Sequence, residues 1–246
     1  MKNRSFSPDS PPPGVPEETK EEHETLRDER LVFFKEAVLE EDVRKRVEAD
    51  IAKIAADPGR FIDKGGAGAV YNSAAGICIK VLEPREMSPN AHLMDIGNPV
   101  EVEASIQRML TEVVDGARAP WCYAFMKGRL ASEKSVIVME QLDAVNLQMV
   151  MNGTQELPEG FDPDDFLMAL SSYIDYMHDD AGVVHLDLAP RNVMVDRKTG
   201  TPRIIDFGRS RLTDKMSEGG RESAMRADSK AYEDIEDKLY NLTDNE

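Results

Sequence analysis

The sequence predicts an α+β fold, with a small antiparallel sheet and one helix first and a shortened helical part after them. Strand-like runs separated by turn residues fill positions 61–82, and two more follow at 121–126 and 135–140. Between these strands, and again from residue 166, apolar residues recur at the steps of three and four that are typical of packed helices. These elements run with the strands first and most of the helices after them, which is typical of the α+β class.

The first 58 residues are predicted to divide into a polar tail and a helical extension. Residues 1–20 are nearly free of apolar side chains and contain the run Pro11-Pro12-Pro13, so we expect them to be disordered. The stretch 21–58 is expected to form one or two helices that pack on the domain at 59–246, and it ends at Asp57-Pro58-Gly59. Two apolar faces carry this prediction, one with Leu31, Phe34 and Val38 and the other with Val43, Val47, Ile51 and Ile54.

A glycine-rich turn lies within the first strands. Strand residues Phe61-Ile62 lead to Gly65, Gly66 and Gly68, and a second strand, a turn at 74–76 and the run 77–82 follow. Glycines let a backbone approach a phosphate closely, although a flexible hairpin would use the same residues. Lys80 stands in the otherwise apolar run 77–82, where its charge needs a partner.

The next helix offers that partner. Asn98-Pro99 is a good start signal for a helix that we expect to run to about Val114. Both Glu101 and Glu103 lie in its first turn, and we prefer Glu103 because Ile106, Met109 and Leu110 give the helix an adjacent packing face. Two later helices are predicted, at 166–178 and at 227–242, the last with an apolar stripe of Ile235, Leu239 and Leu242.

Two short motifs near the end of the chain indicate phosphoryl transfer. The run from His185 to Asn192 is followed, after one hairpin's length, by Asp206-Phe207-Gly208. Phosphoryl transfer needs one carboxylate to hold the acceptor hydroxyl, while an amide and a second carboxylate hold magnesium on the phosphates. Asp187, Asn192 and Asp206 supply these groups in that order, which makes Asp187 the candidate for the acceptor side and the other two the metal ligands.

Taken together, residues 61–207 resemble the protein-kinase-like superfamily. The resemblance implies ATP and Mg²⁺ as cofactors, with Lys80 on the phosphates, Glu103 on Lys80, and His185 as a structural member of the catalytic loop. It also implies a hinge at 138–142 whose backbone pairs with adenine, with Met139 as its gatekeeper. The cofactor-binding residues implied in this way are Gly65, Gly66, Gly68, Val70, Cys78, Lys80, Glu103, Met139, Glu140 and Leu142.

The chain departs from the kinase pattern at several positions. Asp63 replaces the first glycine of the loop, which puts a carboxylate near the phosphate path. Leu186 replaces an arginine that binds activation-loop phosphate in many kinases, so control by such phosphorylation is not expected. Ala189 and Arg191 are similar to the tyrosine-kinase version of the loop, and only base rate favours Ser or Thr as the acceptor.

The second lobe is predicted to be truncated. We expect an N-lobe at about 59–140 and a minimal C-lobe at about 141–246 that lacks an Ala-Pro-Glu motif and the helical platform for peptide substrates. This shape is similar to compact atypical kinases, such as RIO-like and KEOPS-complex kinases, and to small effector kinases of pathogenic bacteria. We therefore expect an ATP-dependent protein kinase with a protein substrate, helped by an activating protein partner in place of the platform. A small-molecule phosphotransferase and a catalytically weak pseudokinase scaffold are the alternatives.

Charge and hydropathy restrict the partners and the location. The formal net charge of −17 argues against nucleic acid and against an anionic membrane, because binding to either depends on Lys and Arg. Cys78 and Cys122 show no metal-ligand spacing and are expected to be buried free thiols, which fits a reducing compartment. No apolar run approaches the roughly 20 residues that span a bilayer. We expect a cytoplasmic protein, or one delivered into a host cell as an effector.

Overall fold

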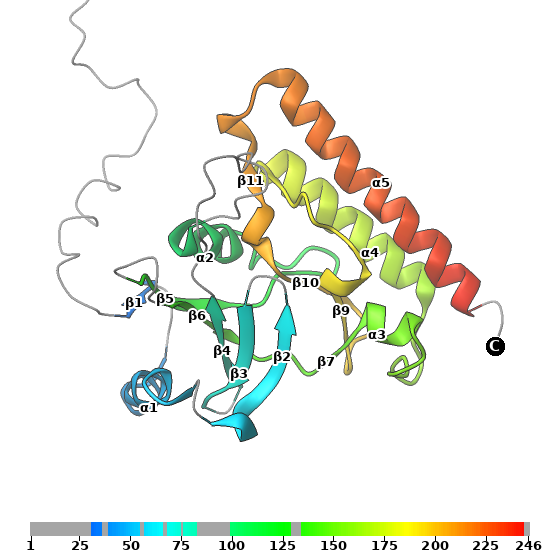
Figure 1. Cartoon of the computed structure of the whole chain (residues 1–246). Helices are drawn as coiled ribbons and strands as arrows, with labels where there is room; N and C mark the ends of the chain where they lie inside the picture. The colour runs from blue at the N-terminus through cyan, green and yellow to red at the C-terminus, as the bar shows by residue number, and fades with distance from the viewer. Residues whose placement is uncertain are drawn as a thin grey trace, which may run out of the picture.

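The computed structural model describes residues 31–35, 39–54, 57–65, 68–74, 76–82, 99–128 and 134–243. The predicted polar tail, Val38, Gly66 and Asn98 lie outside the described residues. The described chain forms an N-lobe built on one sheet and a C-lobe built mainly of helices (Figure 1). The predicted α+β, two-lobed fold is therefore confirmed, whereas the domain boundaries and the truncation of the C-lobe stay predictions.

The N-lobe sheet is antiparallel, with its strands in the spatial order β1, β5, β6, β4, β3 and β2. β4 and β6 lie at its centre because both are short apolar runs that can be buried on both faces. The strands are β1 Val32–Phe33, β2 Phe61–Gly65, β3 Gly68–Asn72, β4 Ile77–Leu82, β5 Cys122–Met126 and β6 Ser135–Glu140.

The two helices of the N-lobe cover opposite faces of this sheet. α1 (Glu41–Ile51) packs Val47 against Ile79 and its neighbours, and Ile54 just beyond the helix joins the same cluster. α2 (Val100–Met109) packs Val100 and Ala104 on the other face, beside Ile137. The described part of the extension is therefore a cover for the sheet, as Figure 1 shows with α1 and α2 on either side of the strands.

Two sequence predictions in the N-lobe were wrong. Val32–Phe33 is an edge strand paired with β5, not part of a helix, because a two-residue strand carries no readable period and its sheet partner is distant in sequence. α2 ends at Met109 rather than near Val114. Beyond the helix the chain reverses in a turn at residues 114–117. Asp115 has φ 48° and Gly116 has φ 86°, and the backbones of Val114 and Ala117 bond to each other across the turn.

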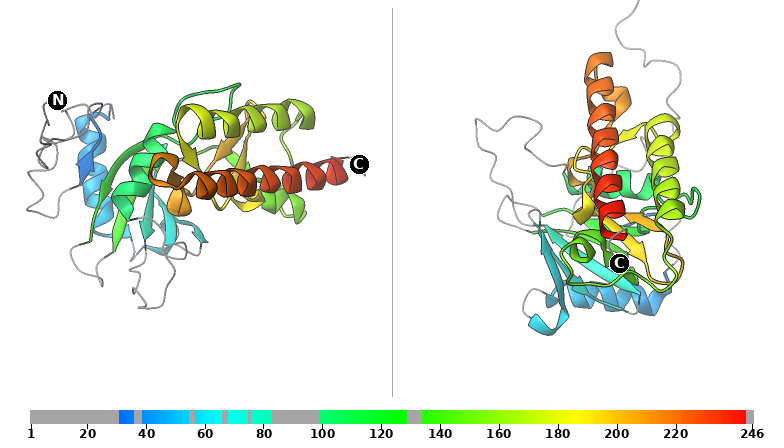
Figure 2. Two further views of the ribbon diagram at one scale, coloured as in Figure 1. Left: turned by 90° about the horizontal axis from the view of Figure 1, so that it is seen from above. Right: turned by 90° about the vertical axis from the view of Figure 1, so that its right-hand side faces the viewer.

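The C-lobe combines two small sheets with three helices. One sheet has the order β10-β9-β7 and the other pairs β11 with β8, all antiparallel. α4 and α5 lie side by side in both views of Figure 2, and Ile235 and Leu239 of α5 are fully buried in the core of this lobe. The bounds are β7 Ala144–Asn146, α3 Leu147–Met151, α4 Pro163–Asp175, a π-helical turn Tyr176–Asp180, β8 Val183–Val184, β9 Val193–Asp196, β10 Pro202–Ile204, β11 Arg211–Leu212 and α5 Glu218–Thr243.

The last helix begins nine residues before its predicted start, at 218 instead of 227. Its first turn contains Gly219 and Gly220, two residues of weak helix propensity that give the sequence no helix signal there. Ser217 offsets their weak helix propensity, because its hydroxyl accepts from Gly220 N and its carbonyl accepts from Arg221 N. Among the described helices, none has the length and apolar character needed to cross a lipid bilayer. The cytoplasmic or host-cell location stays a prediction.

Candidate active site

A buried lysine joins the two lobes. Lys80 on β4 places its Nζ 2.7 Å from Glu103 Oε1 on α2 and 2.8 Å from Asp206 Oδ1 in the C-lobe. Burial by itself would lower the pKa of Lys80, but the two carboxylates outweigh it and raise this pKa. Glu101, the alternative partner, instead bonds Lys127 at 2.7 Å. Lys80 is thus a fixed cation at the point where β4, α2 and the C-lobe meet.

Asp206 is held in an uncommon backbone conformation. Its φ is 65°, in the left-handed region, and its Oδ1 also accepts from Gly208 N at 3.4 Å. Burial raises the pKa of Asp206, yet the charge of Lys80 outweighs that effect and leaves the pKa below its ordinary value. Phe207, the next residue, is fully buried, with its ring 5.2 Å from that of His185. The buried ring anchors the turn that presents the Asp206 carboxylate.

The catalytic loop centres on Asp187. Arg191 Nη2 donates to Asp187 Oδ1 at 2.6 Å, and Asn192 Nδ2 donates to Asp187 O at 2.8 Å and to Oδ2 at 3.1 Å. These bonds involve only the nitrogen of the Asn192 amide, so its oxygen is the atom left to serve a metal. Arg191 is mostly exposed, so Asp187 is held from the solvent side of the loop.

The backbone of Ile205 ties this loop to Asp206. Ile205 N donates to Asn192 O at 2.9 Å, and His185 Nε2 lies 3.1 Å from Ile205 O. Because Asp187 N donates to His185 Nδ1, the ring bonds fit a neutral imidazole that carries its proton on Nε2. Full burial lowers the pKa of His185, in agreement with that form. The backbone before Asp206 is thus fixed to the segment that carries Asp187 and Asn192.

Asp228 is a positioning residue that the sequence interpretation missed. This carboxylate on α5 is 2% exposed and accepts from His185 N at 2.7 Å, Leu186 N at 2.9 Å and His178 Nε2 at 3.1 Å. It thereby holds Leu186 at φ 61°, a strained value for a leucine. The signal was present in the sequence, since Asp228 lies seven residues before Ile235 on the same buried stripe, where a carboxylate needs partners.

The predicted nucleotide-binding residues of the N-lobe line up along β2, β3 and β4. Gly65 and Gly68 are paired in register, and Val70 is paired with Lys80. Cys78 Sγ donates to Glu140 O at 3.5 Å, and burial raises the pKa of this thiol to about 12, so it stays neutral. Asp63 is exposed, and its carboxylate accepts from Lys64 N at 2.7 Å.

The hinge residues join the end of β6 to the C-lobe. Met139 Sδ lies 3.6 Å from Gln107 Nε2, which links the gatekeeper to α2. The Glu140 carboxylate is occupied by Arg118, and Glu140 N donates to Trp121 O at 2.8 Å. Its carbonyl, which accepts only the long bond from Cys78 Sγ, is the Glu140 group that could still bind a nucleotide. Leu142 is half-buried just beyond.

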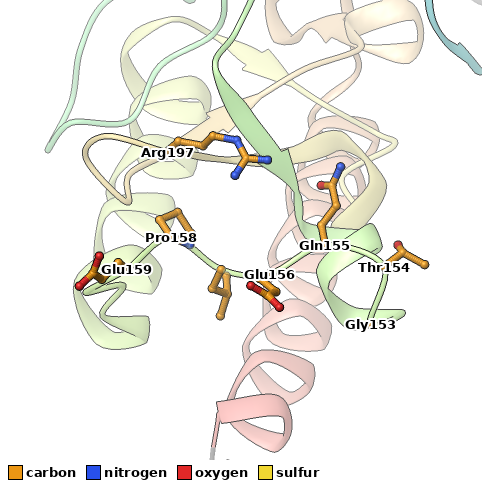
Figure 3. Close-up of a pocket in the computed structure, with 8 residues that line it drawn as sticks. Gly153, Thr154, Gln155, Glu156, Pro158, Glu159 and Arg197 are labelled. Carbon is orange, nitrogen blue, oxygen red and sulfur yellow. The ribbon is translucent and has the colours of Figure 1, made fainter.

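A separate hollow lies on the C-lobe and not at these residues. It encloses about 590 Å³ and is lined by segment 153–159 and Arg197. Figure 3 shows Arg197 extending over it from the β9–β10 hairpin, opposite the segment 153–159. The lining includes Glu156 and Glu159 as well as this arginine, so its charges are mixed. None of the residues with a predicted role in phosphoryl transfer lines this hollow.

The donor set of the site fits a hard divalent cation and phosphate. Asp206 offers carboxylate oxygen and Asn192 amide oxygen, the ligand types that Mg²⁺ prefers, and Mg²⁺ is usually held by one or two carboxylates together with substrate phosphates. Lys80 supplies a buried positive charge directly beside Asp206. A single carboxylate, Asp187, remains for an acceptor group. The arrangement can therefore position a phosphorylated nucleotide next to a hydroxyl.

Comparison with known proteins identifies the family of this chain. A model of the protein kinase domain matches residues 60–232, well over half of the chain. The chain belongs to the protein kinase family. The match includes every site residue described above from Lys80 to Asp228.

Two similar proteins align over parts of the chain. Human ribosomal protein S6 kinase alpha-4 is 50% identical over 48 residues, which are 19% of this chain and 6% of that protein. The dual specificity mitogen-activated protein kinase kinase mek-2 of Caenorhabditis elegans is 25% identical over 122 residues, 48% of this chain and 31% of that protein. The chain thus spans less than a third of the length of these curated relatives. The closer likeness to RIO-like, KEOPS-complex or bacterial effector kinases stays a prediction.

Proposed function

We propose that this kinase transfers the γ-phosphate of Mg-ATP to a hydroxyl group of a protein. The observation that carries the proposal is the ion triad in which Lys80 contacts Glu103 at 2.7 Å and Asp206 at 2.8 Å. The triad aligns a phosphate-binding cation with a metal-binding carboxylate across the two lobes. A buried charge cluster of this kind is costly to maintain without a role, which favours a functional site.

Each polar side chain then has a distinct task. Lys80 holds the phosphates, and Asp206 with the amide oxygen of Asn192 holds Mg²⁺. Mg²⁺, when bound, neutralises the charge that develops on the transferred group. Asp187 accepts a hydrogen bond from the acceptor hydroxyl and takes up its proton as the new P–O bond forms and the bond between the γ-phosphorus and the β–γ bridging oxygen breaks, which releases ADP. Catalysis depends on positioning, because Asn192 and Arg191 already orient the Asp187 carboxylate.

Ser or Thr is the proposed acceptor, although the loop carries the arginine of the tyrosine-kinase version. That arginine, Arg191, bonds Asp187 at its exposed side, and Ser or Thr is proposed on base rate alone. Phosphoamino-acid analysis of the labelled product decides this point. Phosphoserine or phosphothreonine is expected, and phosphotyrosine alone would contradict the assignment.

Among the alternative functions, a small-molecule phosphotransferase receives little support from the fold. Such enzymes place large helical insertions after the hinge, whereas positions 143–165 here hold β7, the short α3 and the start of α4. The pseudokinase alternative rests on Asp63 and on the predicted truncation of the second lobe. It is opposed by Lys80, Asp187, Asn192 and Asp206, all of which occupy mutually bonded positions.

The face of α5 that points away from the core is polar. The buried stripe of this helix consists of Ala224, Asp228, Ile235 and Leu239, and its outward residues include the exposed and charged Arg226, Lys230, Glu233 and Asp237. A polar helix face is stable in water without a cover. We therefore do not expect the predicted activating protein to dock on this face of α5, and its role stays a proposal.

The test incubates the isolated chain with γ-labelled ATP, Mg²⁺ and, in separate reactions, a protein lysate, choline or an aminoglycoside. Label is expected in protein from the lysate only. An Asp206→Asn variant is expected to transfer none at any Mg²⁺ concentration. Label in choline or aminoglycoside would favour the small-molecule enzyme, and equal labelling by wild type and Asp206→Asn would favour the scaffold.

A further inference from the structure

One residue of the segment that follows α2 contacts both lobes. The backbone of Arg118 extends the β10 edge, with Arg118 N bonded to Pro202 O at 3.4 Å and Ile204 N bonded to Arg118 O at 3.3 Å. β10 ends at Ile204, two residues before Asp206. Through its backbone, Arg118 is therefore part of the C-lobe structure that presents the metal-ligand candidate.

The side chain of Arg118 binds the last residue of the N-lobe sheet. Its Nη1 and Nη2 lie 2.6 Å and 2.7 Å from the two carboxylate oxygens of Glu140, which is a bidentate ion pair. Trp121 N adds a third donor to Glu140 at 3.1 Å. Both side chains are largely shielded, with 14% and 22% of their surfaces exposed, so water screens the pair only in part.

The pair remains ionised over a broad pH range. The hydrogen bond with Glu140 raises the pKa of Arg118. Burial raises the pKa of Glu140, but the Arg118 guanidinium more than compensates and leaves it below its ordinary value. This is a permanent link of defined geometry between the hinge and β10.

We propose that Arg118 and Glu140 form a clamp that fixes the distance between the adenine-binding edge of the hinge and the phosphate-binding residues. The inference rests on the proposed function, because it assumes that ATP spans these two places. Glu140 is paired in register with Ile77 on β4, the strand that carries Lys80, while Arg118 is paired with β10, which leads to Asp206. The clamp thus sets the hinge against both partners of the Lys80–Asp206 ion pair, and its two members are positioning residues.

A different result is expected from an ion pair that serves stability alone. Arg60 bonds Asp50 at 2.7 Å, and Asp50 is 7% exposed, but both residues belong to the N-lobe and neither adjoins the hinge. Arg60→Gln therefore controls for the loss of a partly buried Arg–carboxylate pair as such. It is expected to lower stability without changing nucleotide affinity.

The test compares wild type, Arg118→Gln, Arg118→Lys, Glu140→Gln and Arg60→Gln for the dissociation constants of ATP and adenosine, after circular dichroism has verified folding. Arg118→Gln and Glu140→Gln are expected to weaken ATP binding about tenfold, equal to roughly 1.4 kcal/mol. The dissociation constant of adenosine, which contacts the hinge but not the phosphate-binding residues, should change by less than about twofold. A general defect of the protein would instead weaken the binding of ATP and adenosine equally. Arg118→Lys keeps the charge and one of the two contacts, so its dissociation constant for ATP should lie between those of wild type and Arg118→Gln.

Three outcomes would overturn the clamp. The first is a folded Arg118→Gln protein with wild-type ATP affinity, the second is equal loss of ATP and adenosine, and the third is a matching loss of ATP affinity in Arg60→Gln. A wild-type chain that binds adenosine and ATP with no preference, or neither of them, would refute the proposed function itself. That result is distinguishable because it is seen before any substitution is made.

Discussion

Asp228→Asn removes the charge beneath the catalytic loop with almost no change of shape. The carboxylate accepts from the backbone N–H groups of His185 and Leu186 through different oxygens, at 2.7 Å and 2.9 Å. An asparagine keeps one acceptor oxygen and turns an NH₂ group toward the other backbone donor. Loss of one charge-assisted hydrogen bond, with a buried N–H left unpaired, costs roughly 2 to 4 kcal/mol. Domains are stable by about 5 to 15 kcal/mol, so the variant should fold with a clearly lowered free energy of unfolding.

Urea denaturation and steady-state kinetics measure the two consequences. The free energy of unfolding should fall by the stated amount, and kcat should fall because the loop that holds Asp187 is no longer fixed. ATP affinity should stay within about twofold, because Lys80 is not in contact with the altered group. Asp234→Asn, the same substitution at an exposed position of α5, is the matched control. An Asp228→Asn protein with the stability and kcat of this control would refute the reasoning.

Three further predictions concern charge, titration and backbone packing. Lys80→Met should lower the free energy of unfolding by about 3 kcal/mol, because the charge of Glu103 is left buried and uncompensated. Adding Glu103→Gln should recover part of this stability without restoring ATP binding. A Lys80→Met protein with wild-type stability would contradict the prediction. Burial keeps His185 neutral and lowers its pKa. Its contribution to the free energy of unfolding should therefore be fully present above about pH 6.5 and decline by up to roughly 1.4 kcal/mol per pH unit below that pH. His185→Phe should flatten that decline in urea titrations at pH 7 and pH 5, and equal slopes would count against it. Gly68→Ala should reduce the melting temperature because its Cβ collides with the β4 backbone, whereas Gly219→Ala, with no neighbour within 4 Å, should not.

The central strands and the motif residues could be predicted from the sequence because their signals are local. The boundaries of Ile77–Leu82 and Ser135–Glu140 were correct, since each is a continuous apolar run with polar or turn residues at both ends. Asp187 and Asn192 lie in one short loop, where their spacing alone brings their side chains together.

The missed features depend on contacts between distant segments. Val32–Phe33 becomes a strand only because β5 provides an edge, and no periodicity in two residues can signal that. Arg118 gives no sign in the sequence of its pairing with Glu140, because the pair forms only after the segment beyond α2 turns back on β10. Asp228 was readable as a charge on a buried stripe, but its donors, 43 and 42 residues away, were not. Tertiary structure, not propensity, determined these positions.

The most direct test of the proposed phosphoryl transfer is the single-turnover rate with γ-labelled ATP, Mg²⁺ and a protein acceptor, in wild type and Asp187→Asn. Asparagine keeps the size of the side chain and an oxygen for Arg191, but it cannot take the proton of a hydroxyl. Transfer by wild type is expected, with a rate at least about 100-fold lower in the variant and an ATP dissociation constant within about twofold in both. Equal rates in the two proteins, or no transfer by wild type, would contradict the assignment of this chain as an active protein kinase.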